Sequence, residues 1–309
     1  MAPGRIMEAL EARCLLAGDL VSQWLADDLN GTVDAGSALV RWHDSQGGVE
    51  ALAVGTPTLI ADAVGGRSVV RFEPTDGTDG FRIRSTNNPV VGADDFSVIV
   101  AFRTDSQALE GGQEEWYENT GLVDSNARGF SYDWGLTMNA AGQLSAGFGD
   151  SGDPTTTIYS TVGGLNDGQL HIAGFSRSGS HVALHVDDQP ADQRDDISSE
   201  ARSPLDLTFG MLQTGMLPFT GDIAQIRIYD GALSAEEVAA VRDEVTAYYN
   251  NQLPQTAGDE YTLAEDDPAF SVSAAEGILR NDSDPDSDAL TAEVVGDPEH
   301  GELSLDPSG

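Results

Sequence analysis

The most regular pattern of hydrophobic and polar positions lies between residues 220 and 249. Apolar and polar residues alternate from Ala224 to Ile228, which is the period of a strand with one buried face. Asp230-Gly231 then favours a turn, because both residue types are common in turns. We therefore expect a strand that ends near residue 229.

A helix is expected directly after this turn. Ser234 and Glu237 have the spacing of a capping box, in which each side chain satisfies a backbone N–H group of the first turn. Val238, Val241 and Val245 follow at helical spacing and form one narrow apolar stripe. One short helix after a final strand, in a chain otherwise rich in strand patterns, indicates the closing element of an all-β domain.

Other segments of the chain also have the pattern of strands. In residues 96–103 one face is apolar, and Ile99 and Ala101 keep the other face moderately apolar, as in a strand buried on both sides. Residues 170–177 and 181–188 alternate on either side of Ser178-Gly179-Ser180, which predicts a hairpin. Shorter strands are expected around residues 21–26, 41–44, 57–61, 68–72 and 80–83.

The segments Gly221–Tyr229 and Ala232–Glu237 resemble the C-terminal end of a laminin-G-like jelly roll, which has the form G-x-I-D-x-[VI]-R-I-Y-x-x-A-L-S-x-x-E. The predicted hairpin and the run Leu207–Gly210 resemble two further strands of that family, with Leu170 in place of its usual tryptophan. The resemblance covers residues 20–250 and implies a concanavalin A-like jelly-roll β-sandwich. The acidic residue of the family motif follows the isoleucine, whereas Asp222 precedes it here.

The segments outside residues 20–250 have other patterns. Residues 1–19 lack the apolar core of a secretion signal, and part of this leader resembles the LEPRxLL segment near the N-terminus of large bacterial surface proteins. A short amphipathic helix or a disordered leader is the alternative. Residues 251–258 form a polar linker. Residues 259–309 resemble the first half of a cadherin-like, Ig-like tandem repeat of bacterial adhesins, so we expect further repeats in a longer chain.

Composition narrows the range of partners. The 309 residues carry a formal net charge of -37, which repels nucleic acid and anionic lipid, so neither is expected as a partner. Cys14 is the only cysteine, so the chain cannot form an intrachain disulfide. No apolar run approaches the roughly 18–20 residues that span a bilayer, so membrane insertion is not expected. The acidity predicts a solvated surface, calcium binding by some of the aspartates, or both.

The first candidate calcium site lies in the sandwich. The resemblance implies a structural calcium near the meeting of the first and last strands, with the acidic residue of the closing strand as a ligand. Asp222 is the nearest match to that residue. Asp27 and Asp28, which follow the first expected strand, are the residues that would face it.

The second candidate calcium site is a loop of the repeat with four alternating acids, Asp282, Asp284, Asp286 and Asp288. Glu293 stands where an EF-hand would have its last ligand, but Ser287 occupies the position of the required glycine and neither flank is helical. We therefore interpret this segment as an Asp-rich loop between strands. It either binds calcium together with a neighbouring domain or is a charged, solvated turn.

A candidate ligand-binding cluster lies in the middle of the chain, where Trp116, Tyr117, Tyr132 and Trp134 occur among glycines and acids. Aromatic faces can stack on sugar rings while carboxylates and amides bond the hydroxyls. The alternative is that these large aromatics belong to the core, as is usual within strand-like runs.

Catalysis is not expected. Glycosidases of the concanavalin A-like class use carboxylates in an E-x-D-x-x-E arrangement, and the only comparable cluster, Glu114 to Glu118, omits the middle acid. His181 and His185 share a strand face, which is more often a polar outer face than a zinc site. We expect a non-catalytic recognition or adhesion module of a bacterial extracellular or surface protein, with carbohydrate or another surface protein as ligand. A structural spacer and a glycan-cleaving enzyme are the alternatives.

Overall fold

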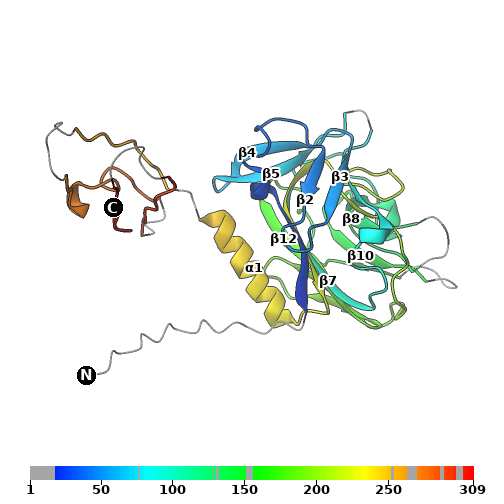
Figure 1. Cartoon of the computed structure of the whole chain (residues 1–309). Coiled ribbons are helices and arrows are strands. Elements are labelled where there is room, and N and C mark those ends of the chain that lie inside the picture. Colours follow the sequence, from blue (N-terminus) through cyan, green and yellow to red (C-terminus); the bar gives the residue numbers. More distant parts are fainter. Residues whose placement is uncertain are drawn as a thin grey trace, which may run out of the picture. The chain divides into compact units, whose positions relative to one another are not determined.

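The computed structural model describes residues 18–75, 77–127, 129, 132–150, 156–251, 254–262, 270–285, 289–296 and 302–309. The predicted leader therefore lies outside the described residues, except for its last two positions. The chain divides into two compact units, residues 1–246 and 247–309. The first unit is almost entirely β-structure (Figure 1).

The first unit consists of two antiparallel sheets, each with eight strands in the described part of the chain. The order in the first sheet is β14 (Asp192–Arg194), β13 (His181–Val186), β12 (Leu170–Ser178), β7 (Asp95–Arg103), β16 (Gly221–Asp230), β5 (Arg67–Phe72) and β4 (Thr58–Val64), with β1 (Asp19–Leu25) also paired to β16. The order in the second sheet is β11 (Thr156–Tyr159), β10 (Leu144–Phe148), β9 (Trp134–Met138), β8 (Thr120–Ser125), β15 (Leu207–Phe209), β6 (Gly80–Ile83), β3 (Glu50–Val54) and β2 (Arg41–His43). Short 3-10 turns occur at η1 (Ala26–Leu29), η2 (Ser85–Asn87) and η3 (Trp116–Glu118). This arrangement confirms the predicted β-sandwich.

Strand β16 joins the N-terminal strand to the rest of the first sheet. One edge of β16 pairs with β7 over most of its length. The other edge pairs with β5 at residues 221–223 and with β1 at residues 225–230. Trp24 of β1 lies opposite Ile226. The predicted closing strand therefore does meet the first strand of the domain.

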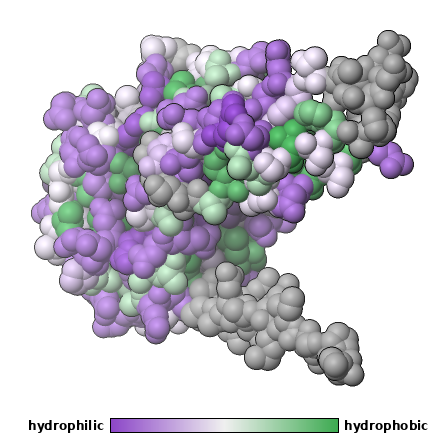
Figure 2. All heavy atoms as spheres, turned by 90° about the vertical axis from the view of Figure 1, so that its left-hand side faces the viewer, coloured by the Kyte–Doolittle hydropathy of each residue, from purple (hydrophilic) through white to green (hydrophobic). Residues whose placement is uncertain are grey.

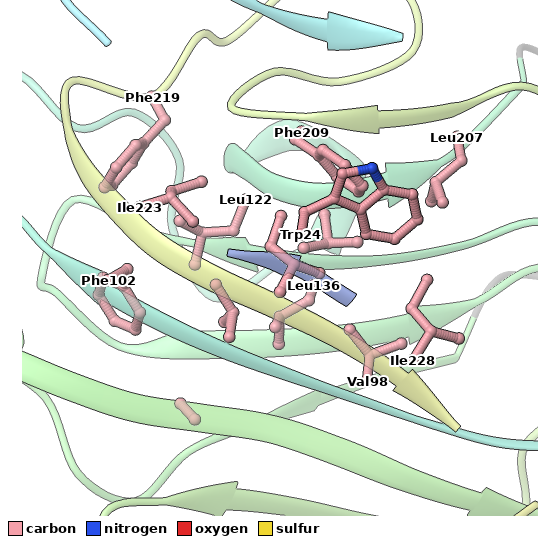
Figure 3. Close-up of a cluster of buried hydrophobic side chains, with 14 of the residues drawn as sticks. Trp24, Val98, Phe102, Leu122, Leu136, Leu207, Phe209, Phe219, Ile223 and Ile228 are labelled. Carbon is pink, nitrogen blue, oxygen red and sulfur yellow. The ribbon is translucent and has the colours of Figure 1, made fainter. Parts of the chain in front are cut away.

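The hydrophobic core fills the space between the two sheets. Trp24 and Phe209 come from opposite sheets, and their ring centroids are 4.8 Å apart in an edge-on contact (Figure 3). Further along, Phe175 packs against Trp134 and Phe148 of the second sheet, with centroid separations of 5.6 and 5.3 Å. Edge-on aromatic pairs add to the free energy of burial, so these contacts hold the sheets face to face.

Helix α1 (Ala235–Asn250) follows β16 and carries the predicted features. Glu237 Oε2 accepts a hydrogen bond from Ser234 N at 2.7 Å, and Ser234 Oγ accepts one from Glu237 N at 3.3 Å, which is the reciprocal capping box. Val238, Val241 and Val245 are all buried. Arg227 on the outer face of β16 donates to Glu244 at 2.8 Å. The helix therefore covers the outer face of the first sheet, where Ile99 is also buried.

The second unit contains little regular structure in its described part. Beyond α1, Gln255 and Ser283 exchange backbone hydrogen bonds of 2.7 and 3.0 Å as an isolated bridge. This unit also contains one 3-10 turn, η4 (Ala274–Glu276), in which Glu276 N donates to the carbonyl of Ser273 at 2.9 Å. The described residues beyond 250 thus contain bridges and turns, and no extended strand of the predicted Ig-like repeat.

Hydrophilic side chains predominate on the face seen in Figure 2, in keeping with the strongly acidic composition. Among the described helices, none combines the length and the apolar character needed to cross a membrane.

The capping box makes α1 sensitive to a single substitution. Ser234→Ala removes the side-chain acceptor for the N–H of Glu237, and we expect the free energy of unfolding to fall by about 1 kcal/mol. Urea denaturation followed by circular dichroism measures this change. Thr246→Ala, at an exposed position of the same helix, is the control. Equal stability of Ser234→Ala and the parent protein would contradict the assigned cap.

Candidate functional site

A polar cleft lies on the first sheet where strands β5, β16 and β7 run side by side. Its volume is about 380 Å³. Strand register places Asp222 of β16 opposite Arg71 of β5 on one side and opposite Arg103 of β7 on the other. Residues directly opposite each other in an antiparallel pair point to the same face, so the three side chains meet in the cleft.

Both guanidinium groups hydrogen-bond to the carboxylate of Asp222. Arg71 donates from Nε to Oδ1 at 2.8 Å and from Nη2 to Oδ2 at 3.1 Å. Arg103 donates from Nε to Oδ2 at 3.1 Å, and its Nη1 bonds the carbonyl of Ala63. The hydrogen bond to Asp222 raises the pKa of Arg71. Two donors with fixed, planar geometry hold the carboxylate in one orientation.

The remaining walls of the cleft are also polar. Thr220 and Gly221 line the cleft beside Asp222. The other lining residues are Thr104 and Asp105 after β7, Gly168 before β12, and Phe72 and Glu73 at the end of β5. Thr104 donates a hydrogen bond to the carbonyl of Thr220 at 2.6 Å, which ties β7 to the start of β16. The cleft thus presents guanidinium, carboxylate and hydroxyl groups, which can bond a hydroxyl-rich or charged ligand but offer little apolar surface.

A histidine next to the cleft is held by two carboxylates. His171 Nδ1 lies 2.8 Å from Asp187 Oδ2, and Nε2 lies 3.1 Å from Asp167 Oδ1. Burial opposes the charged form of His171, but the hydrogen bonds and charges of the two aspartates outweigh it and raise the pKa of His171 above 6.5. Asp167 directly precedes Gly168 of the cleft wall, so this ion-pair group supports one side of the cleft.

The structure does not bring together the three predicted calcium ligands of the sandwich. Asp222 is bonded by two arginines, as described above. Asp27 Oδ1 accepts the backbone N–H of Ser68 at 2.6 Å, and the neighbouring Asp28 is exposed. Within the described part of the chain, no three His, Cys, Asp or Glu side chains come close enough to hold a metal ion. Calcium at the sandwich stays a prediction.

The predicted calcium loop of the repeat is only partly described. Asp286 and Asp288 lie outside the described residues. Asp282 Oδ1 accepts the backbone N–H of Ala257 at 2.8 Å, and Asp284 is half-buried. This site therefore stays a prediction as well.

The four predicted ligand-binding aromatics lie in different surroundings, and sugar contact by this cluster stays a prediction. Trp134 is buried in the core between the sheets, while Trp116 is buried on the opposite face of the second sheet. Tyr117 is partly exposed, and its ring makes an edge contact with Trp116. Tyr132 lies against the guanidinium of Arg202. Burial of the two tryptophans agrees with the core alternative, because large apolar rings are usually buried.

Sequence reasoning missed the two arginines of the cleft. Arg71 and Arg103 each stand near the end of a run of apolar strand residues, where a charged side chain has little reason to be buried unless it has a partner. A charged residue within an apolar strand run was therefore the sequence feature that could have indicated a buried ion pair. It does not identify the partner, because Asp222 is distant in sequence from both arginines.

Substituting the shared carboxylate tests its importance to the fold. Asp222→Asn leaves two adjacent guanidiniums without their anion, and we expect the free energy of unfolding to fall by about 1–3 kcal/mol, less than for a fully buried pair because both arginines are partly exposed. Thermal or chemical denaturation measures the loss. Asp196→Asn, which breaks the exposed pair with Arg194, is the matched control and should change little. An unchanged Asp222→Asn variant would show that the pair contributes nothing.

Two histidines should give the stability of the domain opposite dependences on pH. The pKa of His171 is raised in the folded protein, so His171 contributes fully to the free energy of unfolding below about pH 6.5. This contribution is lost as pH rises through the pKa that His171 has in the folded state. Burial lowers the pKa of His185 to about 4, so His185 destabilises the fold as pH falls from about 6.5 towards 4.

Melting temperatures of the parent, His171→Asn and His185→Gln proteins between pH 4 and 9 measure the two effects. The difference between the parent and His171→Asn should shrink at alkaline pH. The difference between the parent and His185→Gln should change only in acid. Parallel curves for all three proteins would rule out both assignments.

Comparison with known proteins places this geometry in a family. A family model described as the concanavalin A-like lectin/glucanases superfamily matches residues 75–239, and one described as a bacterial Ig domain matches residues 251–309. The first match covers more than half of the chain. No curated protein matches the sequence.

Solved structures show the same fold at low sequence identity. Domain 4 of the extracellular arabinanase AbnA from Geobacillus stearothermophilus, in complex with arabinotriose, is 15% identical with a TM-score of 0.53, and the match covers 73% of this chain and 99% of that one. The binding domain of Paraclostridial Mosquitocidal Protein 1 is 11% identical with a TM-score of 0.53, and the match covers 75% of this chain and 53% of that one. The binding domain of botulinum neurotoxin serotype D is 12% identical with a TM-score of 0.52, and the match covers 76% of this chain and 54% of that one. This chain therefore matches about half the length of each toxin domain.

The two eight-stranded sheets, the closing strand–helix segment and the family match agree, and the chain belongs to the concanavalin A-like lectin/glucanase superfamily, with a bacterial Ig domain at residues 251–309.

Proposed function

We propose that the sandwich is a non-catalytic recognition module of a bacterial extracellular or surface protein, and that it binds carbohydrate in the cleft around Asp222. The observation that carries this proposal is the cleft itself, about 380 Å³ in volume and lined by arginine, carboxylate and threonine side chains. The Ig domain would connect the module to further domains of the same protein.

The chemistry of the cleft favours a neutral, hydroxyl-rich ligand. Sugar hydroxyls both donate and accept hydrogen bonds, so they can use the acids Glu73 and Asp105 as well as the N–H groups of Arg71 and Arg103. The pairing of both arginines with Asp222 fixes these groups before a ligand arrives, which lowers the entropy cost of binding. A polyanionic ligand would meet a protein with a net charge of -37 and would be repelled.

The similar folds supply the order in which ligands should be tested. The similar arabinanase domain was solved with arabinotriose, so short neutral oligosaccharides are the first class. Two similar toxin domains are described as binding domains, so another surface protein is the second class. Fold similarity alone does not determine function. The competing functions are a structural spacer, which would bind neither class, and a glycan-cleaving enzyme.

Calcium is the cofactor that we propose for the complete protein. The proposal rests on the abundance of aspartate and on the oxygen ligands that calcium prefers. A ligand that binds only the folded state raises stability, so excess chelator should lower the melting temperature of the full chain. A melting curve that excess chelator leaves unchanged would contradict the proposal that the protein binds calcium.

Glycan-array screening of the full chain, followed by titration calorimetry of the best ligand, tests carbohydrate binding. Glu73→Ala and Asp105→Ala each remove one cleft acid without breaking the Asp222 ion pairs, and we expect each variant to bind at least about 10-fold more weakly. Asp188→Ala, an exposed acid outside the cleft, is the control.

A chain that binds no glycan would favour the spacer or protein-binding function, and binding unaffected by both cleft variants would place the glycan elsewhere. Release of reducing sugar from candidate polysaccharides would favour the enzyme.

A further inference from the structure

A second feature of the domain lies on the outer face of the second sheet, away from the cleft. Strand pairing aligns one row of residues across all eight strands of this sheet, in the order Arg41, Leu52, Arg82, Thr208, Asp124, Gly135, Gly147 and Thr157. Two glycines are therefore neighbours in this row, on β9 and β10. They leave a stretch of bare backbone where other strands present side chains.

The indole of Trp116 lies on these two glycines. A Cβ atom built on Gly135 would come within 2.2 Å of Cζ3 of Trp116, and one built on Gly147 would come within 1.7 Å of Cδ1. These separations are far below van der Waals contact, so no other residue type fits either position while the indole is in place. The glycines form the floor of a flat slot with the thickness and length of one ring system.

Trp116 reaches the slot from residues 110–118, here called the strap. All nine residues are described, and Trp116 is the only one of them that is buried. Its backbone is held by two hydroxyls, since Thr137 Oγ1 donates to the carbonyl of Trp116 at 3.0 Å and Thr157 Oγ1 accepts from its N–H at 3.3 Å. Side-chain burial in the strap thus depends on one residue.

Two buried polar atoms at the slot lack hydrogen bonds to the described residues, one on the sheet and one on the indole itself. Oδ2 of Asp124 and Nε1 of Trp116 are both buried, and neither has a hydrogen-bond partner within the described part of the chain. Asp124 adjoins Gly135 in the row, and its other oxygen, Oδ1, accepts the N–H groups of Gln213 and Asn126 at 2.7 and 3.1 Å. A buried polar atom without a partner lowers stability, because it has lost its hydrogen bonds to water. The indole of Trp116 therefore matches the shape of the slot, but it leaves two buried polar atoms of the described chain without hydrogen bonds.

The strap is strongly acidic. Glu110, Glu114, Glu115 and Glu118 lie within nine residues, and no lysine or arginine occurs between residues 104 and 127. Burial raises the pKa of Tyr159 on β11, a hydrogen bond from Asn119 lowers it, and the charges of Glu115, Glu118 and Glu114 raise it, so the negative potential of the strap reaches this strand. An anionic ligand is therefore disfavoured at the slot.

We infer that the slot over Gly135 and Gly147 is a second binding site, for one neutral hydroxylated ring of pyranose size, and that Trp116 is an intramolecular occupant which such a ring displaces. A sugar ring has a similar thickness to an indole, and its hydroxyls can donate to Oδ2 of Asp124. Because the strap and the ring compete, the observed affinity equals the intrinsic affinity multiplied by the fraction of molecules with the slot open. Removing the indole therefore raises affinity.

Opposite effects of two substitutions test this competition. In the full chain, Trp116→Ala opens the slot, and its dissociation constants for cellobiose, maltose and lactose should include at least one that is 10-fold or more lower than for the parent protein. Adding Gly147→Ala to Trp116→Ala fills the floor of the slot and should abolish the gain. Gln107→Ala, at an exposed position just before the strap, is the matched control and should leave affinity unchanged. Titration calorimetry or NMR titration gives the constants.

Three further readouts make the test decisive. Indole should bind Trp116→Ala in competition with the disaccharide, and indole binding without any disaccharide binding would overturn the proposal, because the slot would then be an ordinary cavity. A gain that survives Gly147→Ala would also overturn it. If Trp116→Ala fails to fold, hydrogen exchange of residues 110–118 in the parent protein should increase when the disaccharide is added at high concentration, and unchanged exchange would overturn the proposal. Glu73→Ala and Asp105→Ala should leave the slot unaffected, so its failure is separable from that of the Asp222 cleft.

Discussion

The constraint on which the structure depends is the pairing of β16 along both of its edges. One edge is used by β7, and the other is shared end to end by β5 and β1. A strand in this position cannot shift by one residue without turning Ile223, Ile226 and Ile228 out of the core. The bulge between residues 223 and 225 lets one strand serve both partners while its apolar face stays buried. Loss of this register would open the sandwich at its centre.

The same register determines the chemistry of the cleft. Asp222 lies where β16 still pairs with β5 and already pairs with β7, so it has an opposite residue on each side. Both of those residues are arginines, and the carboxylate carries two guanidiniums because of its position in the sheet. Partial exposure limits what these bonds add to stability. Their stronger effect is to hold several hydrogen-bonding groups at fixed positions at the edge of a cleft.

Elements with a clear period could be predicted from the sequence, and elements without one could not. The strand before Asp230, the helix after Ser234 and the hairpin around Gly179 all combine alternation or helical spacing with a turn or cap residue, and the structure confirms them. Strands β8–β11 were not predicted, because several of their outward residues, among them Gly135, Thr137, Ser145 and Gly147, are small and buried, so these strands do not alternate between apolar and polar residues. The predicted sites depend on contacts between distant segments, so residue type alone could not place them.

Trp116 shows why the aromatic cluster could be interpreted in two ways. Its burial agrees with the core alternative, yet it lies outside the core between the sheets, with its indole against Gly135 and Gly147. A core tryptophan such as Trp134 is surrounded by side chains from both sheets, and removing it leaves a cavity that nothing from solvent can enter. Trp116 is instead held over bare backbone by one acidic segment, so its removal exposes a surface of defined shape with an unpaired carboxyl oxygen at its edge. Complete burial therefore does not exclude a role in binding when the segment that buries the residue can itself be displaced.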